Sequence, residues 1–370
     1  RPRWQAQQAE HLGNNPKGRQ GLRFGGFPSF AQAFFCDSFD RRWGGCESGA
    51  RAAWTRLGRY HTDLHIDDRG HTPRGLSGRS SSCSAVGYKK DNLEVWVNLS
   101  NKAFPVPGKL KQHGPARIIA MCNQKGGVGK TTTTINLAAA LAEYGRKILV
   151  VDFDPQGALS VNLDADYQDA TTIYDLLMDS TLDPVAAIQK TSIENLDVIP
   201  ANIDLSAAEM NLVTEMGRER VLDGILKKVK NDYDIIFIDC QPSLGLLTVN
   251  ALTAAHGVLI PMATEFFALR GVALLVQTID KVKARTNPSL ELDGLIPTMH
   301  DARTLHAREV LARLQEAFPT LVFDTAIART VKFPDATVAR KPITQFAPNS
   351  AAAESYRRVA RELVKRGSAA

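Results

Sequence analysis

The stretch CNQKGGVGKTTTT, residues 122–134, decides the fold of this chain. It departs in one place from the phosphate-binding pattern GxxxxGK[ST], in which a glycine stands six positions before the lysine. Gln124 occupies that position, and Lys125 beside it adds a second cation. A helix that opens at Lys130 would direct its positive end at an anion. The stretch therefore predicts a phosphate-binding loop with one lysine more than the pattern requires.

The residues of this loop have distinct expected roles. Its glycines let the backbone approach phosphates closely and turn N–H groups toward them. Lys130 is expected to reach the β- and γ-phosphates, and the Thr131 hydroxyl to ligate Mg²⁺. The residues expected to contact the nucleotide are Gly126, Gly127, Val128, Gly129, Lys130, Thr131 and Thr132.

From residue 117 onward, apolar β-branched runs alternate with helical patterns. The expected strands are RIIAMCN, KILVVDF, LDVIPA, DIIFIDC, GVLIPMA and LDGLIPTM, and the clearest helices lie in TINLAAALAEYG, ERVLDGILKKVK and GVALLVQTIDKVKA. Runs that are apolar almost throughout are typical of strands covered on both faces. The alternation predicts an α/β fold with a doubly wound, mostly parallel sheet and helices on both faces.

Three aspartates stand at the expected carboxyl ends of strands, where ligands bind in such sheets. Asp239 closes an apolar strand and is the expected Mg²⁺ partner, acting through water. Asp152 and Asp154 are two residues apart, so strand alternation could point both toward the phosphates. One could position the attacking water and the other support Mg²⁺. Alternatively, one of the two, Asp152 more readily than Asp154, only caps the turn that follows.

The N-terminal part of the chain has a different composition. Residues 1–115 hold 18 Lys and Arg against 9 Asp and Glu, and the chain totals of 45 and 39 leave 27 against 30 for residues 116–370. The overall charge of +6 therefore belongs to the leading segment. This segment is rich in Gly, Ser, Arg and Pro with few apolar residues, which predicts a disordered basic extension. A DNA-reading helical module would need amphipathic helices, and a spurious upstream translation is the remaining alternative.

The composition also disfavours several classes of protein. The five cysteines form no C-x-x-C pair, which disfavours a disulfide framework or zinc site and favours a reducing cytosol. No apolar run is long enough for a membrane span. Residues 116–370 are thus expected to form one cytoplasmic nucleotide-binding domain.

The loop KGGVGKT, the strand end VVDFDPQG and the segment IDCQPSLG together resemble the deviant Walker A ATPases of the ParA/MinD type. The chain is most similar to the chromosomal ParA (Soj) group. The resemblance runs from about Arg117 to Lys365 and includes EFFALRGVALL, TMHDARTLHAREVL and ARTVKFPDATVARKPI. It implies an ATPase that uses ATP and Mg²⁺.

The resemblance also assigns roles to residues. It implies that Lys125 reaches across an ATP-bound dimer to the partner's nucleotide, with Gly126 at the point of closest approach. It makes Asp154 the residue required for hydrolysis and Asp239 the Walker B acid. Pro242–Ser243 would belong to a nucleotide-sensing switch. Before that proline, Cys240 and Gln241 replace the family's usual small residue and proline, which is a modest departure.

ParA-like proteins bind DNA non-specifically as ATP dimers and hydrolyse ATP when a ParB-like partner stimulates them. Such binding needs cations directed at phosphates without base reading. The positions that match the family's DNA-contacting surface are Arg329, Lys332, Arg357 and Arg358, with Arg303 a weaker candidate. Each taken alone is as well explained as a solvated charge. Together they predict a nucleoid-associated protein.

Two rival functions remain at this point. A MinD-like membrane ATPase would end in an amphipathic helix with bulky apolar residues. Here Tyr356, Val359, Leu363 and Val364 of the last expected helix fit packing on the domain instead. An iron–sulfur reductase of the nitrogenase iron-protein type would need two cysteines per subunit placed to bridge a cluster. Cys122 and Cys240 are the only cysteines near the loop.

Overall fold

The computed structural model describes residues 103–265, 268–367 and 369. Within them, a seven-stranded sheet has the order β3-β4-β2-β5-β1-β6-β7. Every neighbouring pair is parallel except the short edge strand β3 against β4. The strands are β1 (Arg117–Met121), β2 (Ile148–Phe153), β3 (Gln189–Lys190), β4 (Leu196–Ile199), β5 (Ile235–Cys240), β6 (Gly257–Ala263) and β7 (Glu291–Thr298).

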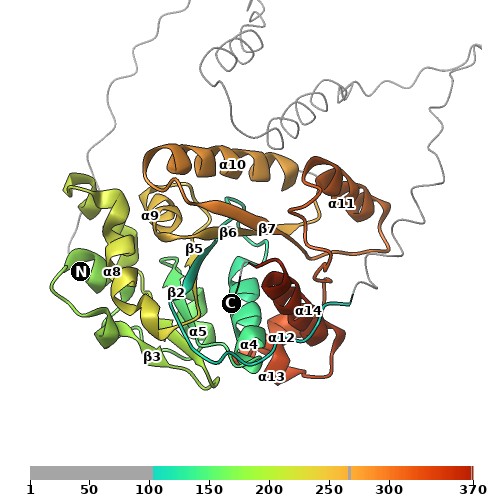
Figure 1. Ribbon diagram of the computed structural model, residues 1–370, viewed down its shortest axis with the longest axis horizontal. Coiled ribbons are helices and arrows are strands. Elements are labelled where there is room, and N and C mark those ends of the chain that lie inside the picture. The colour runs from blue at the N-terminus through green and yellow to red at the C-terminus, as the bar shows by residue number, and fades with distance from the viewer. Residues whose placement is uncertain (1–102, 266–267, 368, 370) are drawn as a thin grey trace, which may run out of the picture. The chain divides into compact units, whose positions relative to one another are not determined.

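Helices cover both faces of this sheet (Figure 1). One layer contains α6 (Ile173–Met178), α7 (Leu205–Asn211), α8 (Val221–Val229), α9 (Leu246–Ala254), α10 (Ala268–Arg285) and α11 (Leu305–Ala317). The other contains α4 (Lys130–Glu143), α5 (Ala158–Asn162), α12 (Lys332–Val338), α13 (Ile343–Phe346) and α14 (Ala351–Lys365). The predicted doubly wound α/β fold is confirmed.

The central strands are buried on both sides because their residues serve two cores alternately. In β1, Ile118 and Ala120 belong to the core under α9 and α10, whereas Ile119 and Met121 belong to the core under α4 and α14. All six residues of β2 and of β5 are buried. Two-sided burial explains why these strands are apolar almost throughout and do not alternate with polar residues.

The described structure begins before residue 116, the predicted start of the domain. Phe104 is buried, with the Lys365 ammonium 5.5 Å from its ring centroid. The Gly108 carbonyl accepts a hydrogen bond from Arg146, and His113 contacts the buried Asp234. Residues 103–115 therefore pack on the ATPase domain. The sequence predicts disorder for residues 1–115. Residues 1–102 of this segment lie outside the described residues.

Candidate nucleotide site

The glycine loop joins the end of β1 to the start of α4. Gly127 and Gly129 have φ values of 71° and 83°, in the left-handed region that favours glycine. An added Cβ at Gly126, Gly127 or Gly129 would meet no heavy atom within 4 Å. The loop thus borders open space on its glycine side. The open space beside the glycines and the N-terminus of the fourteen-residue helix α4 together suit a bound phosphate chain.

Two hydrogen bonds that the sequence did not reveal anchor this loop to the sheet. The Thr298 hydroxyl, at the end of β7, donates to the Val128 carbonyl at 2.7 Å. The Asn123 amide donates to the Pro261 carbonyl of β6 at 2.8 Å and accepts from the Lys125 N–H at 3.0 Å. These partners stand up to 170 residues away along the chain, so no local pattern could have identified them.

Lys130 lies at the first position of α4 and is only 7% exposed. Its ammonium group donates to the Lys125 carbonyl at 3.3 Å. It also lies close enough to Asp239 for its charge to favour the ionised carboxylate. A buried ammonium with only these partners is placed to exchange the loop carbonyl for phosphate oxygens.

Asp239 lies beside the start of α4. Its Oδ1 accepts a hydrogen bond of 3.0 Å from Thr134, whereas its Oδ2 is buried without a hydrogen-bond partner. Burial raises the pKa of Asp239 to about 6, although the hydroxyls of Thr131 and Thr134 and the Lys130 charge oppose this shift. A buried carboxylate oxygen without a partner, next to the Thr131 hydroxyl, fits a hydrated Mg²⁺ held mainly by phosphate oxygens. The described residues contain no cluster of three acidic, His or Cys ligands.

Asp152 pairs with Asp239 across β2 and β5 and is fully buried. Its Oδ2 accepts from the N–H and the hydroxyl of Ser160, at 2.8 and 2.7 Å, and its Oδ1 accepts from the Asp154 N–H at 3.3 Å. Burial, and then the charge of Asp239, raise the pKa of Asp152 to about 7. These contacts support the alternative that Asp152 holds the turn before α5, and they leave little room for metal ligation.

Asp154 occupies a different environment from Asp152. The strand ends at Phe153, so Asp154 lies in the turn, half-buried, and accepts from the Gln156 N–H at 3.0 Å. Strand alternation therefore does not extend to Asp154, and the carboxylates of Asp152 and Asp154 have different environments. Of the pair, Asp154 is only half-buried, whereas Asp152 is fully buried.

Lys125, the additional lysine, is exposed on the outer side of the loop and forms an ion pair with Glu265. Glu265 follows β6, and the hydrogen bond from Lys125 lowers the pKa of its carboxyl group. Arg329 and His306 also act on this carboxylate through their charges. The Lys125 ammonium group therefore contacts a carboxylate of its own chain.

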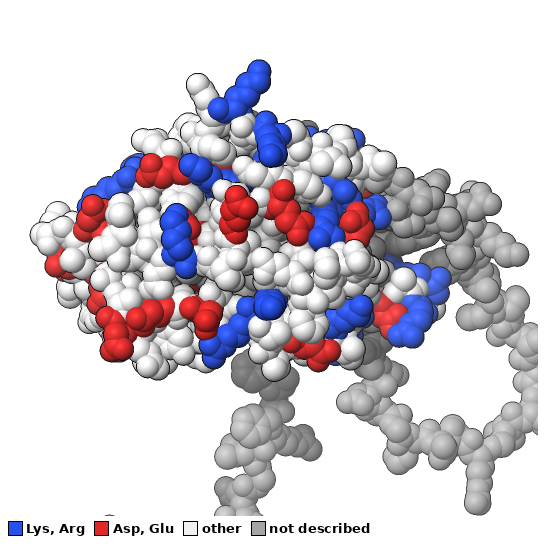
Figure 2. Space-filling view, turned by 90° about the horizontal axis from the view of Figure 1, so that it is seen from below, with Lys and Arg blue, Asp and Glu red and all other residues white. Residues whose placement is uncertain are grey.

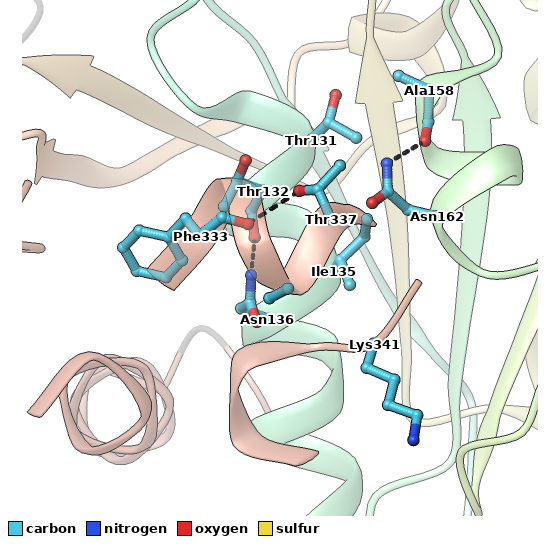
Figure 3. Close-up of a pocket in the computed structure, with 10 residues that line it drawn as sticks. Thr131, Thr132, Ile135, Asn136, Ala158, Asn162, Phe333, Thr337 and Lys341 are labelled. Atoms are coloured by element: carbon cyan, nitrogen blue, oxygen red, sulfur yellow. Dashed lines mark hydrogen bonds between the residues drawn. The ribbon is translucent and has the colours of Figure 1, made fainter. Parts of the chain in front are cut away.

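A cavity of about 230 Å³ lies against the start of α4 (Figure 3). Thr131 and Thr132 form one wall, Ala158 and Asn162 of α5 a second, and Phe333 and Thr337 of α12 a third. The cavity brings α12 next to residues that are predicted to bind the nucleotide. A movement of this end of α4 could therefore also shift α12, which lines the same cavity.

The four predicted DNA contacts fall into two groups. Arg329 and Lys332 are exposed, and Lys332 opens α12. Arg357 instead donates to both oxygens of Glu143, at 2.7 and 3.2 Å, and to the Pro348 carbonyl. Arg358 is half-buried on the same helix.

Charge alone does not mark a nucleic-acid surface on the face that Figure 2 shows, because basic and acidic side chains are interspersed there. The guanidinium of Arg303, the weaker candidate, donates hydrogen bonds to both carboxylate oxygens of Asp301.

The glycine loop with its helix, the buried lysine, and the aspartate with an unpartnered oxygen define a P-loop nucleoside-triphosphate hydrolase. A family model described as an AAA domain matches residues 116–292. The Soj protein of Bacillus subtilis, named a sporulation initiation inhibitor, is 44% identical over 252 residues, which cover 68% of this chain and 99% of the relative. The chain belongs to the ParA/Soj family of partitioning ATPases.

Two further relatives extend this comparison. A crystal structure titled cobyrinic acid a,c-diamide synthase from Mycobacterium smegmatis, with a bound ATP analogue and magnesium, has a TM-score of 0.60 and 40% identity, covering 68% of this chain and 96% of that one. An uncharacterized protein of Mycobacterium tuberculosis is 49% identical over 310 residues, covering 83% of this chain and 95% of the relative. The protein is an ATPase whose cofactors are ATP and Mg²⁺.

The mycobacterial match also bears on the N-terminal segment. Residues 116–370 are 255 of the 370 residues, so a match over 310 residues extends into the residues before 116. Part of the basic segment therefore has a counterpart in that relative, which argues against a spurious translation of all of it.

Proposed function

We propose that this protein is a DNA-segregation ATPase that forms an ATP-bound dimer, binds DNA non-specifically and hydrolyses ATP when a ParB-like partner stimulates it. Its place in the cell would then be the nucleoid. The observation that carries the proposal is the position of α12, which opens with the exposed Lys332 and also lines the cavity beside Thr131 and Thr132. One element thus adjoins both the nucleotide site and a cation that could contact DNA phosphates.

The chain's own residues divide the work of hydrolysis. The backbone N–H groups of residues 126–129 and the Lys130 ammonium bind the phosphates and neutralise their charge. Mg²⁺, held by Thr131 and through water by Asp239, supplies further charge neutralisation at the phosphate oxygens when bound. Asp154 accepts a hydrogen bond from the attacking water and orients it. We assign Asp152 no metal contact, because Ser160 already occupies its Oδ2.

Lys125 acts in this proposal on the nucleotide of the partner. Gly126 and Gly127 beside it are exposed, so a second subunit can approach the loop closely. Two triphosphates brought face to face repel each other strongly unless a cation lies between them. The ion pair with Glu265 would break when Lys125 moves across the interface.

DNA binding would rest chiefly on Arg329 and Lys332, whereas Arg357 and Arg358 have a supporting position on α14. Phosphate-directed lysines and arginines release counterions, so affinity should fall steeply with salt. Because Arg357 already binds Glu143, we rank it below Arg329 and Lys332 as a direct contact.

The test is co-sedimentation with random-sequence double-stranded DNA in the presence of ATP, ADP or no nucleotide. We expect binding with ATP only, and we expect it to persist in Asp154→Ala, which should bind ATP without hydrolysing it. Arg329→Ala with Lys332→Ala should lose DNA binding while retaining the ATP dimer, as measured by light scattering. The control is Lys227→Ala, which removes an exposed lysine of α8, in the helix layer on the opposite face of the sheet from α12. DNA binding of equal strength with ATP, with ADP and without nucleotide would overturn the proposal.

The rival functions find less support. Tyr356, Val359 and Leu363 of α14 are buried against the domain, so this helix does not present an apolar face to a membrane. No described helix is long and apolar enough to cross a membrane. Cys122 and Cys240 are each 1% exposed, with their sulfur atoms 3.2 Å apart inside one subunit. Buried cysteines of this kind are poorly placed to bridge a cluster between two subunits.

A further inference from the structure

Two residues after Asp239 depart from the family pattern, Cys240 at the end of β5 and Gln241 in the loop that follows, and each has a structural partner. Cys240 contacts Cys122, and the Gln241 side-chain amide donates to Glu209 Oε1 at 3.1 Å. We infer that Glu209 is a positioning residue, which fixes residues 241–245 relative to the nucleotide site. This inference rests on the proposed sensing role of that loop, and it names the residue that sets its resting position.

The Glu209 carboxylate contacts the loop at both ends. Besides the Gln241 amide, Oε1 accepts from the Leu247 N–H at 3.3 Å, an N–H in the first turn of α9. The first N–H groups of a helix have no partner within it, and Gly245 at the N-cap provides no side chain to satisfy them. A carboxylate at this end of a helix is also favoured by the helix dipole. Glu209 therefore caps α9 from a neighbouring helix.

Gly245 allows this approach. An added Cβ there would lie 2.2 Å from Glu209 Oε1 and 3.0 Å from its carboxyl carbon. Any larger residue would push the carboxylate away from the Leu247 N–H. The glycine is thus matched to Glu209, and not to a left-handed backbone, since its φ is −76°.

Glu209 is itself held firmly. It lies on α7, whose Leu205 and Ala208 are fully buried, and Leu212 immediately after the helix is 1% exposed. The carboxylate is half-buried between this anchored helix and the loop. The loop, by comparison, exposes Pro242, and apart from the Gln241 contact its hydrogen bonds to the described residues are short-range, such as that from the Gly245 N–H to the Ser243 hydroxyl. Glu209 is consequently the fixed point and residues 241–245 the part that can move.

The contact with Gln241 is a property of this chain. A proline at that position has no side-chain donor and could not bind Glu209. Gln241 lies two residues after Asp239, so holding it also limits how far the loop can move near the γ-phosphate position. ADP lacks the γ-phosphate, so loss of Glu209 should weaken binding of ATP more than binding of ADP.

The experiment compares Glu209→Ala with Glu209→Gln, whose amide oxygen can still accept from both donors. The control is Glu215→Ala, an exposed glutamate six residues on whose side chain forms no hydrogen bond or ion pair with the described residues, while its backbone N–H donates to the Leu212 carbonyl. Affinities of the full-length protein for a fluorescent non-hydrolysable ATP analogue and for the matching ADP analogue are measured with Mg²⁺. In Glu209→Ala the ratio of ATP to ADP affinity should fall roughly 5- to 10-fold, as expected for lost hydrogen bonds. Glu209→Gln and Glu215→Ala should keep most of the ratio.

A second variant protects the test against misfolding. Gln241→Ala removes only the side-chain amide and should lower the same ratio by a smaller factor. Added to Glu209→Ala it should have little further effect, because both changes break one contact. Equal losses for ATP and ADP, or additive effects of the two variants, would show a purely structural role and overturn the inference. Absence of ATP-dependent DNA binding in the unaltered protein would overturn the proposed function alone, since these affinities need no DNA.

Discussion

Two pairs of buried aspartates, at opposite ends of the parallel strands, have opposite environments. The amino edge of the sheet is the end at which β4 and β5 begin, and the carboxyl edge is the end at which β2 and β5 finish. At the amino edge, Asp234 accepts hydrogen bonds from the N–H groups of Gly114 and Lys147 and contacts His113 at 2.8 Å. Asp197, near the start of β4, binds Lys190 and the Tyr233 hydroxyl. At the carboxyl edge, Asp239 keeps one buried oxygen without a partner, and burial raises the pKa of both Asp239 and Asp152.

This difference separates structure from function within one sheet. At the amino edge, the carboxylates of Asp234 and Asp197 are hydrogen-bonded by groups of the protein itself, so these two aspartates serve stability. The carboxyl edge leaves a buried carboxylate oxygen that only a proton, a hydrated cation or a phosphate-bound metal can satisfy. A site that the chain leaves incomplete is a site prepared for a ligand, and here the ligand is Mg²⁺ with ATP.

The largest expected effect comes from removing the cation of the carboxyl edge. Lys130→Ala should weaken ATP binding by about 4 kcal/mol, roughly 1000-fold, because a buried ammonium that neutralises phosphate and Asp239 is lost. Isothermal titration with ATP and Mg²⁺ measures this change. Lys147→Ala, which leaves the backbone N–H to Asp234 in place, is the control at the amino edge and should bind ATP normally. Nearly unchanged affinity in Lys130→Ala would contradict the assignment of the site.

The second prediction concerns Asp234 at the amino edge of the sheet. Asp234→Ala removes the acceptor for three groups and should lower the free energy of unfolding by about 3 kcal/mol. Urea unfolding measures the loss, and ATP affinity of the folded protein should stay the same. A variant that folds normally but no longer binds ATP would erase the distinction between the two edges.

How far the sequence predicted this arrangement depends on the range of each contact. The positions of Lys130, Thr131 and Asp239 follow from local patterns, because a glycine loop and an apolar strand each fix where their last residues lie. The role of Asp152 remained open, since only the fold brings Ser160 back to its carboxylate. Glu209 and Glu265 carry no motif, and their partners lie 32 and 140 residues away. Side-chain partners across such separations are set by packing, which no short pattern encodes.

The third prediction uses pH. Folding keeps the proton on Asp152 up to about pH 7, whereas an unfolded aspartate releases it near pH 4. Between these values the folded state binds more protons, so the free energy of unfolding should fall as pH rises from 4 to 7. Asp152→Asn should remove about 2 kcal/mol of this decline in the nucleotide-free protein.

Urea unfolding of both proteins at pH 5.5 and pH 8 tests the sign. Asp154→Asn, a change at the half-buried neighbour, is the matched control and should keep the decline. A wild-type protein that gains stability from pH 5.5 to pH 8, with Asp152→Asn losing that gain, would mean that Asp152 is stabilised as an anion.

The smallest expected effect concerns the ion pair between Lys125 and Glu265, at the rim of the carboxyl edge. Both side chains are about half exposed, so one such pair stabilises the monomer by only about 0.5 kcal/mol. An ATP dimer must break two of these pairs if each Lys125 crosses to the partner. Glu265→Gln should therefore tighten ATP-dependent dimerisation by about 1 kcal/mol, roughly 5-fold, and the gain should shrink at high salt.

The sign of this effect is what makes it informative. Light scattering over a range of protein concentrations, in the Asp154→Ala background, gives the dimer dissociation constant for each variant. Asp223→Asn breaks a comparable exposed pair with Lys227 and should change nothing. Lys125→Ala should weaken the dimer, and adding Glu265→Gln to it should have no further effect, because Glu265 acts only through Lys125. If Glu265→Gln weakened the dimer, Glu265 would support the interface, and Lys125 would not be held back by it. In that case only the buried carboxylate of Asp239 at the carboxyl edge would await a ligand. The exposed Lys125–Glu265 pair would already have the arrangement that the dimer needs.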